Sequence, residues 1–284
     1  MQNKIYDTIV IGYGPAGITN AIYLKRFNRD VLVIGKDYGA LESDTYIDNY
    51  YGVPHIKGKD LIDNGIKQAR ELGVDVITDE VLEVTMGLDY SVTTKKDIYH
   101  AKTIFLATGK TRAKLLVPGL KKYEGKGVSY CAICDGFIYR GKKLGIVGSG
   151  EFMKKELETL SRFTKDITVF TNGVELSLEG YNVVTDKIIE FYGEDRLKGI
   201  KTQSSSYDVD GVFIAVGSAS TMSFAKHIGL LTDEQNNLIV ENYKTNLDGI
   251  YSGGDAIGGV AQVVKSASDG ALAAIEMNKY LKTL

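Results

Sequence analysis

Short runs of apolar residues alternate along the chain with longer segments whose apolar positions recur at helical spacing. The first cycle is a predicted strand centred on residues 8–11, a helix over 15–27 and a second strand over 31–34. Strands that alternate with helices in this way are typical of βαβ units, in which helices cover parallel strands. The pattern predicts an α/β fold.

The same cycle recurs in the middle of the chain. Predicted strands over 143–148 and 166–170 flank a helix over 151–163. Each half later closes with an apolar strand that ends in glycine, over 103–109 and over 211–217. The repetition predicts two Rossmann-like, three-layer β/β/α nucleotide-binding domains.

The end of the chain does not complete the second half. A last strand over 249–255 and a helix over 261–280 are interpreted as a return of the chain to the first half. One domain is therefore expected to be inserted in the other. We predict a first domain from residues 1–111 and 245–284, and an inserted domain from residues 112–244.

Composition excludes several classes of protein. The 284 residues are 44% hydrophobic and 25% charged, as in ordinary globular chains. No run of 18 apolar residues is present, and the N-terminus lacks the features of a signal peptide, so a cytoplasmic protein without membrane association is expected. The net charge of −2 gives no indication of nucleic-acid binding.

The first glycine-rich loop carries a complete GxGxxG pattern between a predicted strand and a predicted helix. Gly12 allows the tight turn, Gly14 lets the backbone approach a pyrophosphate, and Gly17 allows close contact between helix and strand. Pro15 suits a first helical turn, where its missing N–H costs nothing. The loop predicts a bound dinucleotide, with its phosphates at the helix N-terminus.

One element of this fingerprint is missing. An acidic residue usually ends the second strand and holds a ribose, but this chain has Gly35 there. Asp37 follows two residues later. Either Asp37 substitutes for the missing acid, or the ribose is held in another way.

The only two cysteines, Cys131 and Cys134, form a C-A-I-C motif. A zinc site would need two further ligands, and the three histidines, His55, His100 and His227, are isolated, so no metal is expected. A purely structural pair has little reason to exist in a reducing cytosol, which leaves a redox dithiol as the favoured interpretation. Asp135 could pass a proton to a departing thiolate, or it could cap a helix.

The order of these motifs resembles the low-molecular-weight thioredoxin reductases over the whole chain. Five separated motifs occur in the order of that family: GxGxxG, ATG, CxxCD, a second GxG, and GGD followed by an AQ-containing helix. The resemblance implies an FAD domain built from both chain ends, an inserted domain that carries the disulfide, and a homodimer.

The resemblance also implies roles for individual residues. Cys134 would face the flavin, Cys131 would attack the disulfide of thioredoxin, and Asp135 would be the general acid–base. The implied flavin contacts are Gly12, Gly14, Pro15, Ala16, Gly17, Asn49, Thr108, Gly109, Gly254, Asp255, Ala261 and Gln262.

The second glycine loop departs from the family pattern, in which the inserted domain binds NADPH. Met153 stands where a small third residue is usual. The strand that follows ends in Thr171-Asn172-Gly173, and no arginine or histidine appears before Arg196 to grip a 2′-phosphate. The segment after this strand also looks shorter than the usual helix-bearing one. We expect a degenerate nicotinamide site.

Without a nicotinamide, another electron donor is needed. The chain resembles a smaller branch, the ferredoxin-dependent flavin thioredoxin reductases, which lack the nicotinamide motifs. Electrons are then expected to pass from reduced ferredoxin through FAD and the Cys131–Cys134 pair to thioredoxin. Residues 111–165 carry twelve Lys or Arg against five Asp or Glu, which favours an acidic partner such as ferredoxin.

Three alternatives to this function are open. The chain could be an NADH- or NADPH-dependent thioredoxin reductase with an altered pocket. It could be a dithiol oxidase that passes electrons from small molecules to oxygen. It could also be a flavin-bound redox sensor without turnover, although the intact CAICD motif favours an enzyme.

Overall fold

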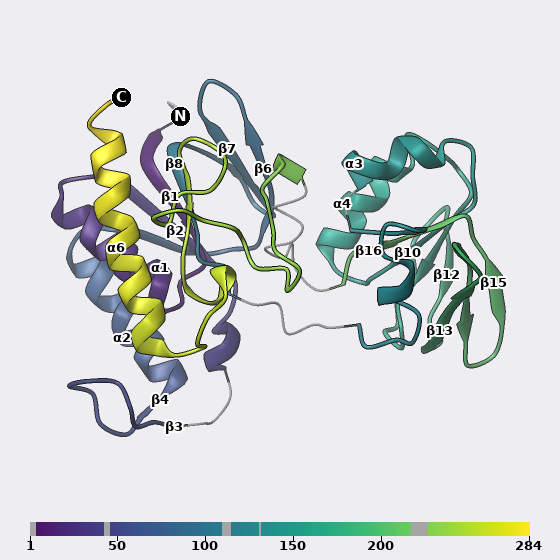
Figure 1. Ribbon diagram of the computed structural model, residues 1–284, viewed down its shortest axis with the longest axis horizontal. Helices are drawn as coiled ribbons and strands as arrows, with labels where there is room; N and C mark the ends of the chain where they lie inside the picture. The colour runs from purple at the N-terminus through teal and green to yellow at the C-terminus, as the bar shows by residue number, and fades with distance from the viewer. Residues whose placement is uncertain (1–3, 43–45, 110–114, 131, 217–226) are drawn as a thin grey trace. The chain divides into compact units, whose positions relative to one another are not determined.

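The computed structural model describes residues 4–42, 46–109, 115–130, 132–216 and 227–284, with the side chains of Ile133 and Cys134 left aside. The chain forms two compact units (Figure 1). Unit 1 consists of Met1–Arg112 and Ser220–Leu284, and unit 2 consists of Ala113–Ala219.

Unit 1 is built on a seven-stranded sheet with the order β5-β2-β1-β8-β7-β6, to which β17 adds by pairing with β8. Five of these strands are parallel: β1 (Ile5–Ile11), β2 (Val31–Gly35), β5 (Asp75–Thr78), β8 (Ile98–Leu106) and β17 (Ile250–Ser252). Two are antiparallel: β6 (Val81–Met86) and β7 (Tyr90–Thr94). The central strands β1 and β2 are almost entirely buried, as expected for strands covered by helices.

The helices of unit 1 pack against one another and against the sheet. Helix α1 (Pro15–Arg26) contacts α2 (Gly58–Glu71) and α6 (Val263–Leu281) (Figure 1). The helices and short elements are α1 (Pro15–Arg26), α2 (Gly58–Glu71), α6 (Val263–Leu281), η1 (Gly39–Leu41), η4 (Gly254–Ile257), β3 (Tyr46–Ile47) and β4 (Ile56–Lys57). A backbone approach explains how tightly α1 meets α6, since a Cβ on Gly270 would lie 2.1 Å from the carbonyl oxygen of Ala16.

Unit 2 has three layers. A parallel sheet has the order β12-β11-β10-β16-β9, and a separate antiparallel sheet has the order β13-β14-β15. The strands are β9 (Val128–Ser129), β10 (Leu144–Val147), β11 (Ile167–Phe170), β12 (Asn182–Val184), β13 (Ile188–Gly193), β14 (Leu197–Thr202), β15 (Ser206–Asp208) and β16 (Gly211–Ile214). The helical elements are α3 (Ala132–Asp135), α4 (Glu151–Leu160), η2 (Lys121–Tyr123) and η3 (Gly136–Tyr139).

A hydrophobic core joins the two sheets of unit 2. Phe170 and Val212 from the parallel sheet pack with Phe191 and Ile200 from the antiparallel one. The buried residues of α4 include Phe152 and further apolar side chains. The predicted α/β class with two Rossmann-like domains is confirmed.

Predicted element boundaries differ from the structure by a few residues. Helix α4 ends at Leu160 rather than Phe163, and the N–H of Phe163 donates to the carbonyl of Leu160 at 2.8 Å in the turn that follows. Helix α6 begins at Val263, two residues later than predicted. Within the described parts of the chain, no helix is both long and apolar enough to span a membrane.

The predicted return to the first domain at residue 245 is wrong. Residues 227–244 already belong to unit 1. The backbone N–H of Leu238 donates to the carbonyl of Ala256, and the N–H of Ser252 donates to the carbonyl of Tyr243, each at 2.9 Å. These residues pair through isolated bridges rather than a long strand, so they carry no periodic apolar signal. The other predicted crossing, near residue 111, lies outside the described residues.

Candidate functional site

Three parallel strands of unit 1 end side by side at one edge of the sheet. Strand β8 lies between β1 and β17, with Leu106 opposite both Ile11 and Ser252. The hydroxyl of Ser252 donates to the carbonyl of Leu106 at 2.8 Å and ties the last two ends together. The loops that follow these strands hold most of the predicted flavin contacts, so the topology brings them to one place.

The first glycine loop is shaped by two backbone approaches that exclude any side chain. Gly12 has a φ of +106°, and a Cβ there would lie 2.3 Å from the carbonyl oxygen of Ala107. A Cβ on Gly17 would lie 1.9 Å from the carbonyl oxygen of Gly12. At Gly14, by contrast, a Cβ would meet no atom within 4 Å. The fold requires glycine at residues 12 and 17, whereas the open space at residue 14 suits a ligand.

The N-terminus of α1 faces this open space. Gly14 is the N-cap, Pro15 is the first helical residue, and no side chain caps the helix. The first turn of a helix has backbone N–H groups without intrahelical partners, and these bind phosphate well. Ala16 lies beside Gly254 of the third loop, since a Cβ on Gly254 would be 3.0 Å from the Ala16 methyl.

The third loop, after β17, is held by an ion pair on α6 whose carboxylate is buried and whose lysine is half-buried. Lys265 donates to the carbonyl oxygens of Gly254 and Gly258, at 2.8 Å and 2.7 Å. Asp269 accepts from the N–H of Gly254 at 2.8 Å and pairs with Lys265 at 2.8 Å. Asp255, in the first turn of η4, is therefore presented by a fixed backbone.

The structure brings together two predicted contacts that lie far apart in sequence. The side-chain amide of Asn49 donates to Oε1 of Gln262 at 2.8 Å. Both residues and Ala261 are exposed. Thr108 and Gly109 are half-buried in the loop that follows β8. A direct contact of these residues with a cofactor stays a prediction.

The missing acid at residue 35 has a packing reason that the sequence did not reveal. A Cβ on Gly35 would lie 1.9 Å from the ring of Tyr13, which is buried. Tyr13 thus occupies the space of a residue-35 side chain. Asp37 accepts a hydrogen bond from the N–H of Gly39 at 2.9 Å, as in a local turn.

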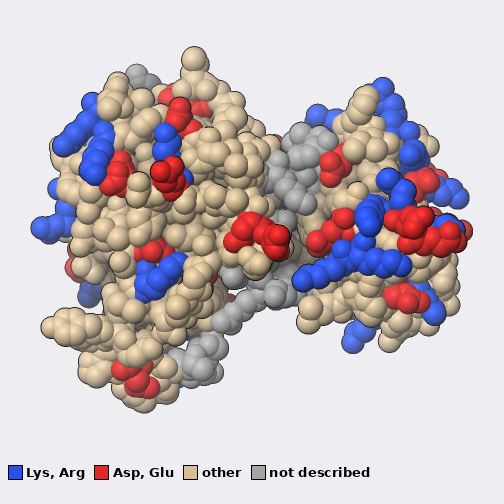
Figure 2. Space-filling view, viewed as in Figure 1, with Lys and Arg blue, Asp and Glu red and all other residues tan. Residues whose placement is uncertain are grey.

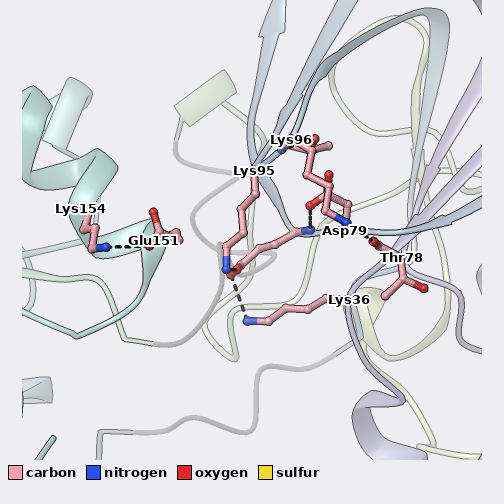
Figure 3. A network of polar contacts seen from close by, with 9 residues as sticks. Lys36, Thr78, Asp79, Lys95, Lys96, Glu151 and Lys154 are labelled. Atoms are coloured by element: carbon pink, nitrogen blue, oxygen red, sulfur yellow. Dashed lines mark hydrogen bonds and ion pairs between the residues drawn. The ribbon is translucent and has the colours of Figure 1, made fainter. Parts of the chain in front are cut away.

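A buried carboxylate also holds this end of the sheet, and sequence reasoning missed it. Glu80 is 5% exposed and accepts from Lys36 at 3.0 Å and from Lys95 at 2.8 Å. Figure 3 shows Lys36 and Lys95 reaching toward one another from different segments, where dashed lines mark their ion pairs. A carboxylate in an interior is stable only when its charge is compensated, so the three residues fix the connection around β2 and β5.

These observations fit an extended dinucleotide such as FAD. The loop glycines leave room for a pyrophosphate at the start of α1, and exposed amides at Asn49 and Gln262 can hydrogen-bond to a flavin ring. Strand β2 ends at Gly35 and presents no acid, so the ribose of a bound dinucleotide would be held by other groups of the loops.

The second glycine loop, in unit 2, keeps the first glycine of the GxGxxG pattern but lacks the third. A Cβ on Gly148 would lie 2.2 Å from the carbonyl oxygen of Ala215, much as at Gly12. The third small residue, however, is replaced by Met153, which is fully buried. At the equivalent place in unit 1 there is no room for even a methyl group. Helix α4 must therefore stand farther from its glycine turn than α1 does.

The turn after β11 is closed by its own hydrogen bonds. Asn172 has a φ of +53° and accepts from the N–H of Ile188 at 2.9 Å, while Gly173 donates to Thr185 at 2.7 Å. No helix separates β11 from β12. The stem of Lys187 would contact a Cβ on Gly173 at 3.4 Å, so one lysine reaches this turn. The sequence of this turn holds no arginine that could bind a 2′-phosphate.

The redox motif lies at the start of α3. Cys131 and the side chain of Cys134 lie outside the described residues, but the backbone from Ala132 to Asp135 forms one helical turn. The hydroxyl of Ser129, at the end of β9, donates to the Asp135 carboxylate at 2.5 Å. Asp135 is therefore held in place by a buried neighbour, and its predicted role in proton exchange with the thiols stays a prediction.

Two phenols flank the motif and stay protonated. Burial, together with the hydrogen bond that Tyr130 donates to Glu124, raises the pKa of Tyr130. Burial also raises the pKa of Tyr139. Neither phenol therefore ionises near neutral pH.

Comparison with known proteins gives consistent results. The model of the pyridine nucleotide-disulphide oxidoreductase family matches residues 6–270. A thioredoxin reductase from Listeria monocytogenes is 31% identical over 306 residues, which covers 100% of this chain and 96% of the relative.

Two solved structures resemble the whole chain. An atypical thioredoxin reductase from Desulfovibrio vulgaris Hildenborough superposes with a TM-score of 0.91 and 32% identity, and covers 98% of both chains. A ferredoxin-flavin thioredoxin reductase from Clostridium acetobutylicum has a TM-score of 0.74 and 28% identity, with 98% of this chain and 99% of that one covered.

Proposed function

The chain belongs to the low-molecular-weight thioredoxin reductases of the pyridine nucleotide-disulphide oxidoreductase family, and we propose that within it the electron donor is reduced ferredoxin. The coarser function follows from the family: a flavoprotein disulfide reductase of the thioredoxin reductase type. The finer proposal concerns where the electrons come from and which protein receives them.

The proposed reaction balances as two coupled conversions. Two one-electron transfers from reduced ferredoxin, with two protons, convert the Cys131–Cys134 disulfide to a dithiol. Bound FAD supplies the site that collects two single electrons. Cys131 then attacks the disulfide of thioredoxin and forms a mixed disulfide with it. Cys134 attacks the Cys131 sulfur of this mixed disulfide, which re-forms the Cys131–Cys134 disulfide and releases thioredoxin as a dithiol. Asp135, held by Ser129, donates and accepts the proton at the thiols.

The single observation that carries the donor proposal is the buried Met153. A nicotinamide dinucleotide needs its pyrophosphate at the start of α4, close to the glycine turn. Met153 is fully buried at the third position of the motif, where a small residue lets the helix and the glycine turn meet closely, so we infer that the start of α4 is displaced from the place where a pyrophosphate would bind. The turn at Asn172 adds a second argument, because each lost charge-assisted contact weakens 2′-phosphate binding by about 1.5–3 kcal/mol.

The likeness to the ferredoxin-flavin enzyme of Clostridium acetobutylicum supports the same donor. The relative from Listeria monocytogenes is named only as a thioredoxin reductase, so a nicotinamide donor is the second candidate. Of the two nicotinamide donors, NADH fits this turn better, because it carries no 2′-phosphate and needs no arginine cluster to bind one. A dithiol oxidase or a sensor has no supporting observation in the structure.

Turnover distinguishes these candidates. Thioredoxin thiols should accumulate when reduced ferredoxin is supplied, and should stay at the background level with NADPH or NADH. Rapid thiol formation with either nicotinamide, at ordinary cofactor concentrations, would replace ferredoxin by that donor. Oxygen consumption with a small dithiol and no ferredoxin would point to the oxidase instead.

Lys142 and Lys143 are proposed to help ferredoxin dock. Their side chains are exposed, and their backbones are fixed by hydrogen bonds to Thr164 and Asp210. On the face of unit 2 drawn in Figure 2, Lys and Arg lie directly beside Asp and Glu. The surplus of positive charge in residues 111–165 is thus interrupted by acids, and we expect steering to depend on individual lysines.

Changing both lysines to glutamine should slow reduction by ferredoxin about three- to tenfold at low salt, with little effect at high salt. Stopped-flow flavin absorbance measures this rate. Lys198→Gln with Lys201→Gln on β14 is the matched control, because it removes the same charge from exposed positions of the same unit. An unchanged rate, or an equal loss in the control, would refute a specific role.

Three further expectations complete the proposal. Unit 1 is proposed to bind FAD, and unit 2 to carry the dithiol and the degenerate nicotinamide site. Thioredoxin and ferredoxin are the proposed partners of a homodimer. The proposed location is the cytoplasm, where both partners are kept reduced.

A further inference from the structure

Glu156 is a buried carboxylate in unit 2 to which the proposed reaction gives no role. It lies on α4, the helix that follows the second glycine loop, and it is 3% exposed. Its Oε2 accepts a hydrogen bond from the backbone N–H of Ala132 at 2.8 Å. Burial of a carboxylate is costly unless donors compensate its charge, so this placement is a specific feature of the fold.

The donor of this hydrogen bond is part of the redox motif. The N–H of Ala132 belongs to the peptide bond that joins it to Cys131. The carboxylate of Glu156 therefore lies one peptide group away from the first cysteine. A negative charge close to a thiol disfavours its thiolate form.

Helix α3 also needs external support. It is a single turn, which is too short to be stable on its own. Glu156 holds its first N–H, and Ser129 holds Asp135 at its last residue. The end of α4 packs closely against the residue that follows, since a Cβ on Gly136 would lie 2.7 Å from the ring of Phe163.

We infer that Glu156 is a positioning residue of the dithiol centre. It fixes the start of α3 through the N–H of Ala132, and its charge sets how readily Cys131 ionises. This inference rests on the proposed redox role of the cysteine pair, and not on the identity of the electron donor. It also gives helix α4 a function that remains when its glycine loop no longer holds a nucleotide.

The test compares Glu156→Gln with Glu158→Gln. Glutamine keeps an oxygen that accepts from Ala132 and removes the charge. Glu158 lies on the same helix but is exposed, so its substitution removes the same charge without touching the motif. Both changes are made in a Cys134→Ser chain, which leaves Cys131 as the sole thiol. The other titratable groups near this turn include Asp135, Tyr139 and Arg196, and they are unchanged.

The measured quantity is the pH profile of Cys131 alkylation by iodoacetamide. Glu156→Gln should move the midpoint of the profile down by about half to one pH unit, and Glu158→Gln should leave it in place. In the chain with both cysteines, Glu156→Gln should shift the equilibrium with dithiothreitol about three- to tenfold toward the dithiol, because the reduced form is stabilised.

An unmoved midpoint and equilibrium in Glu156→Gln would overturn the inference, and Glu156 would then only satisfy a buried N–H. If Glu156→Gln fails to retain flavin and fold, Glu156→Asp takes its place. Aspartate is shorter than glutamate by one methylene, which moves the charge away from the N–H of Ala132. The midpoint of the alkylation profile should therefore fall by a smaller amount than with glutamine, and no shift would again overturn the inference. Because no ferredoxin is used, a different electron donor would not change these outcomes.

Discussion

Replacing Cys134 by serine should lower thioredoxin reduction by at least about a thousandfold while the protein still binds flavin. The reason is that the chain has only two cysteines, so no other thiol can take over either step. Cys131→Ser should cause a loss of the same size. The measurement is the rate of thioredoxin thiol formation with reduced ferredoxin, at matched flavin content.

The two variants should differ in what they trap. Cys131 remains nucleophilic in the Cys134→Ser chain, so this variant should form a stable mixed disulfide with thioredoxin, visible by mass spectrometry. The Cys131→Ser chain should form none. If the adduct forms only in Cys131→Ser, the roles of the two cysteines are exchanged. If either variant keeps more than about a tenth of the parent rate, the dithiol is not the path of the electrons.

Gly14→Ala should fold normally and lose most of its affinity for FAD, whereas Gly17→Ala should lose both stability and flavin. A Cβ at residue 14 meets no atom within 4 Å, but it would fill the space where a pyrophosphate approaches the backbone. A Cβ at residue 17 would collide with the carbonyl oxygen of Gly12 at 1.9 Å. We expect FAD to bind to Gly14→Ala about a hundredfold more weakly, which corresponds to about 2.7 kcal/mol.

The comparison separates ligand binding from folding. Flavin content after purification and titration of the apoprotein with FAD give the affinity, and thermal unfolding of the apoprotein gives the stability. Gly87→Ala is a control for Gly14→Ala, since Gly87 is exposed on the same unit between β6 and β7 and has no positive φ. Retention of the parent affinity in Gly14→Ala would mean that no phosphate lies at this loop.

Local pattern and backbone geometry were predictable from the sequence. Apolar spacing and the need for close backbone approach predicted the first helix, the glycines at residues 12 and 17, and the strands β1, β2, β8, β10, β11, β16 and β17. The return of the chain was predicted too late, because residues 227–244 pair with unit 1 through isolated bridges that leave no periodic pattern.

Contacts between distant side chains could not be predicted. From the sequence alone, the absence of an acid at residue 35 indicates a lost ribose contact. The structure shows that the ring of Tyr13 fills the space of a side chain at this position. The pairing of Ser129 with Asp135 and that of Glu156 with Ala132 depend on how β9 and α4 pack around a single helical turn. No sequence motif of fixed spacing predicts such pairs.

Met153 shows what the structure adds to a sequence prediction. Its position in the motif predicted a degenerate loop, and its complete burial explains why. In unit 1 the third glycine has no room for a Cβ, whereas in unit 2 a whole side chain lies between helix and turn. We therefore propose that the same loop topology binds a nucleotide in unit 1 and not in unit 2.

The most direct test of the ferredoxin proposal is anaerobic reduction of the oxidised flavoprotein, followed by flavin absorbance. NADPH, NADH and reduced ferredoxin are each added to a separate sample in the presence of thioredoxin. We predict bleaching and thioredoxin thiols with ferredoxin, and an unchanged spectrum with either nicotinamide. Prompt bleaching by NADPH or NADH would contradict the account, because it would mean that a nicotinamide binds productively despite Met153.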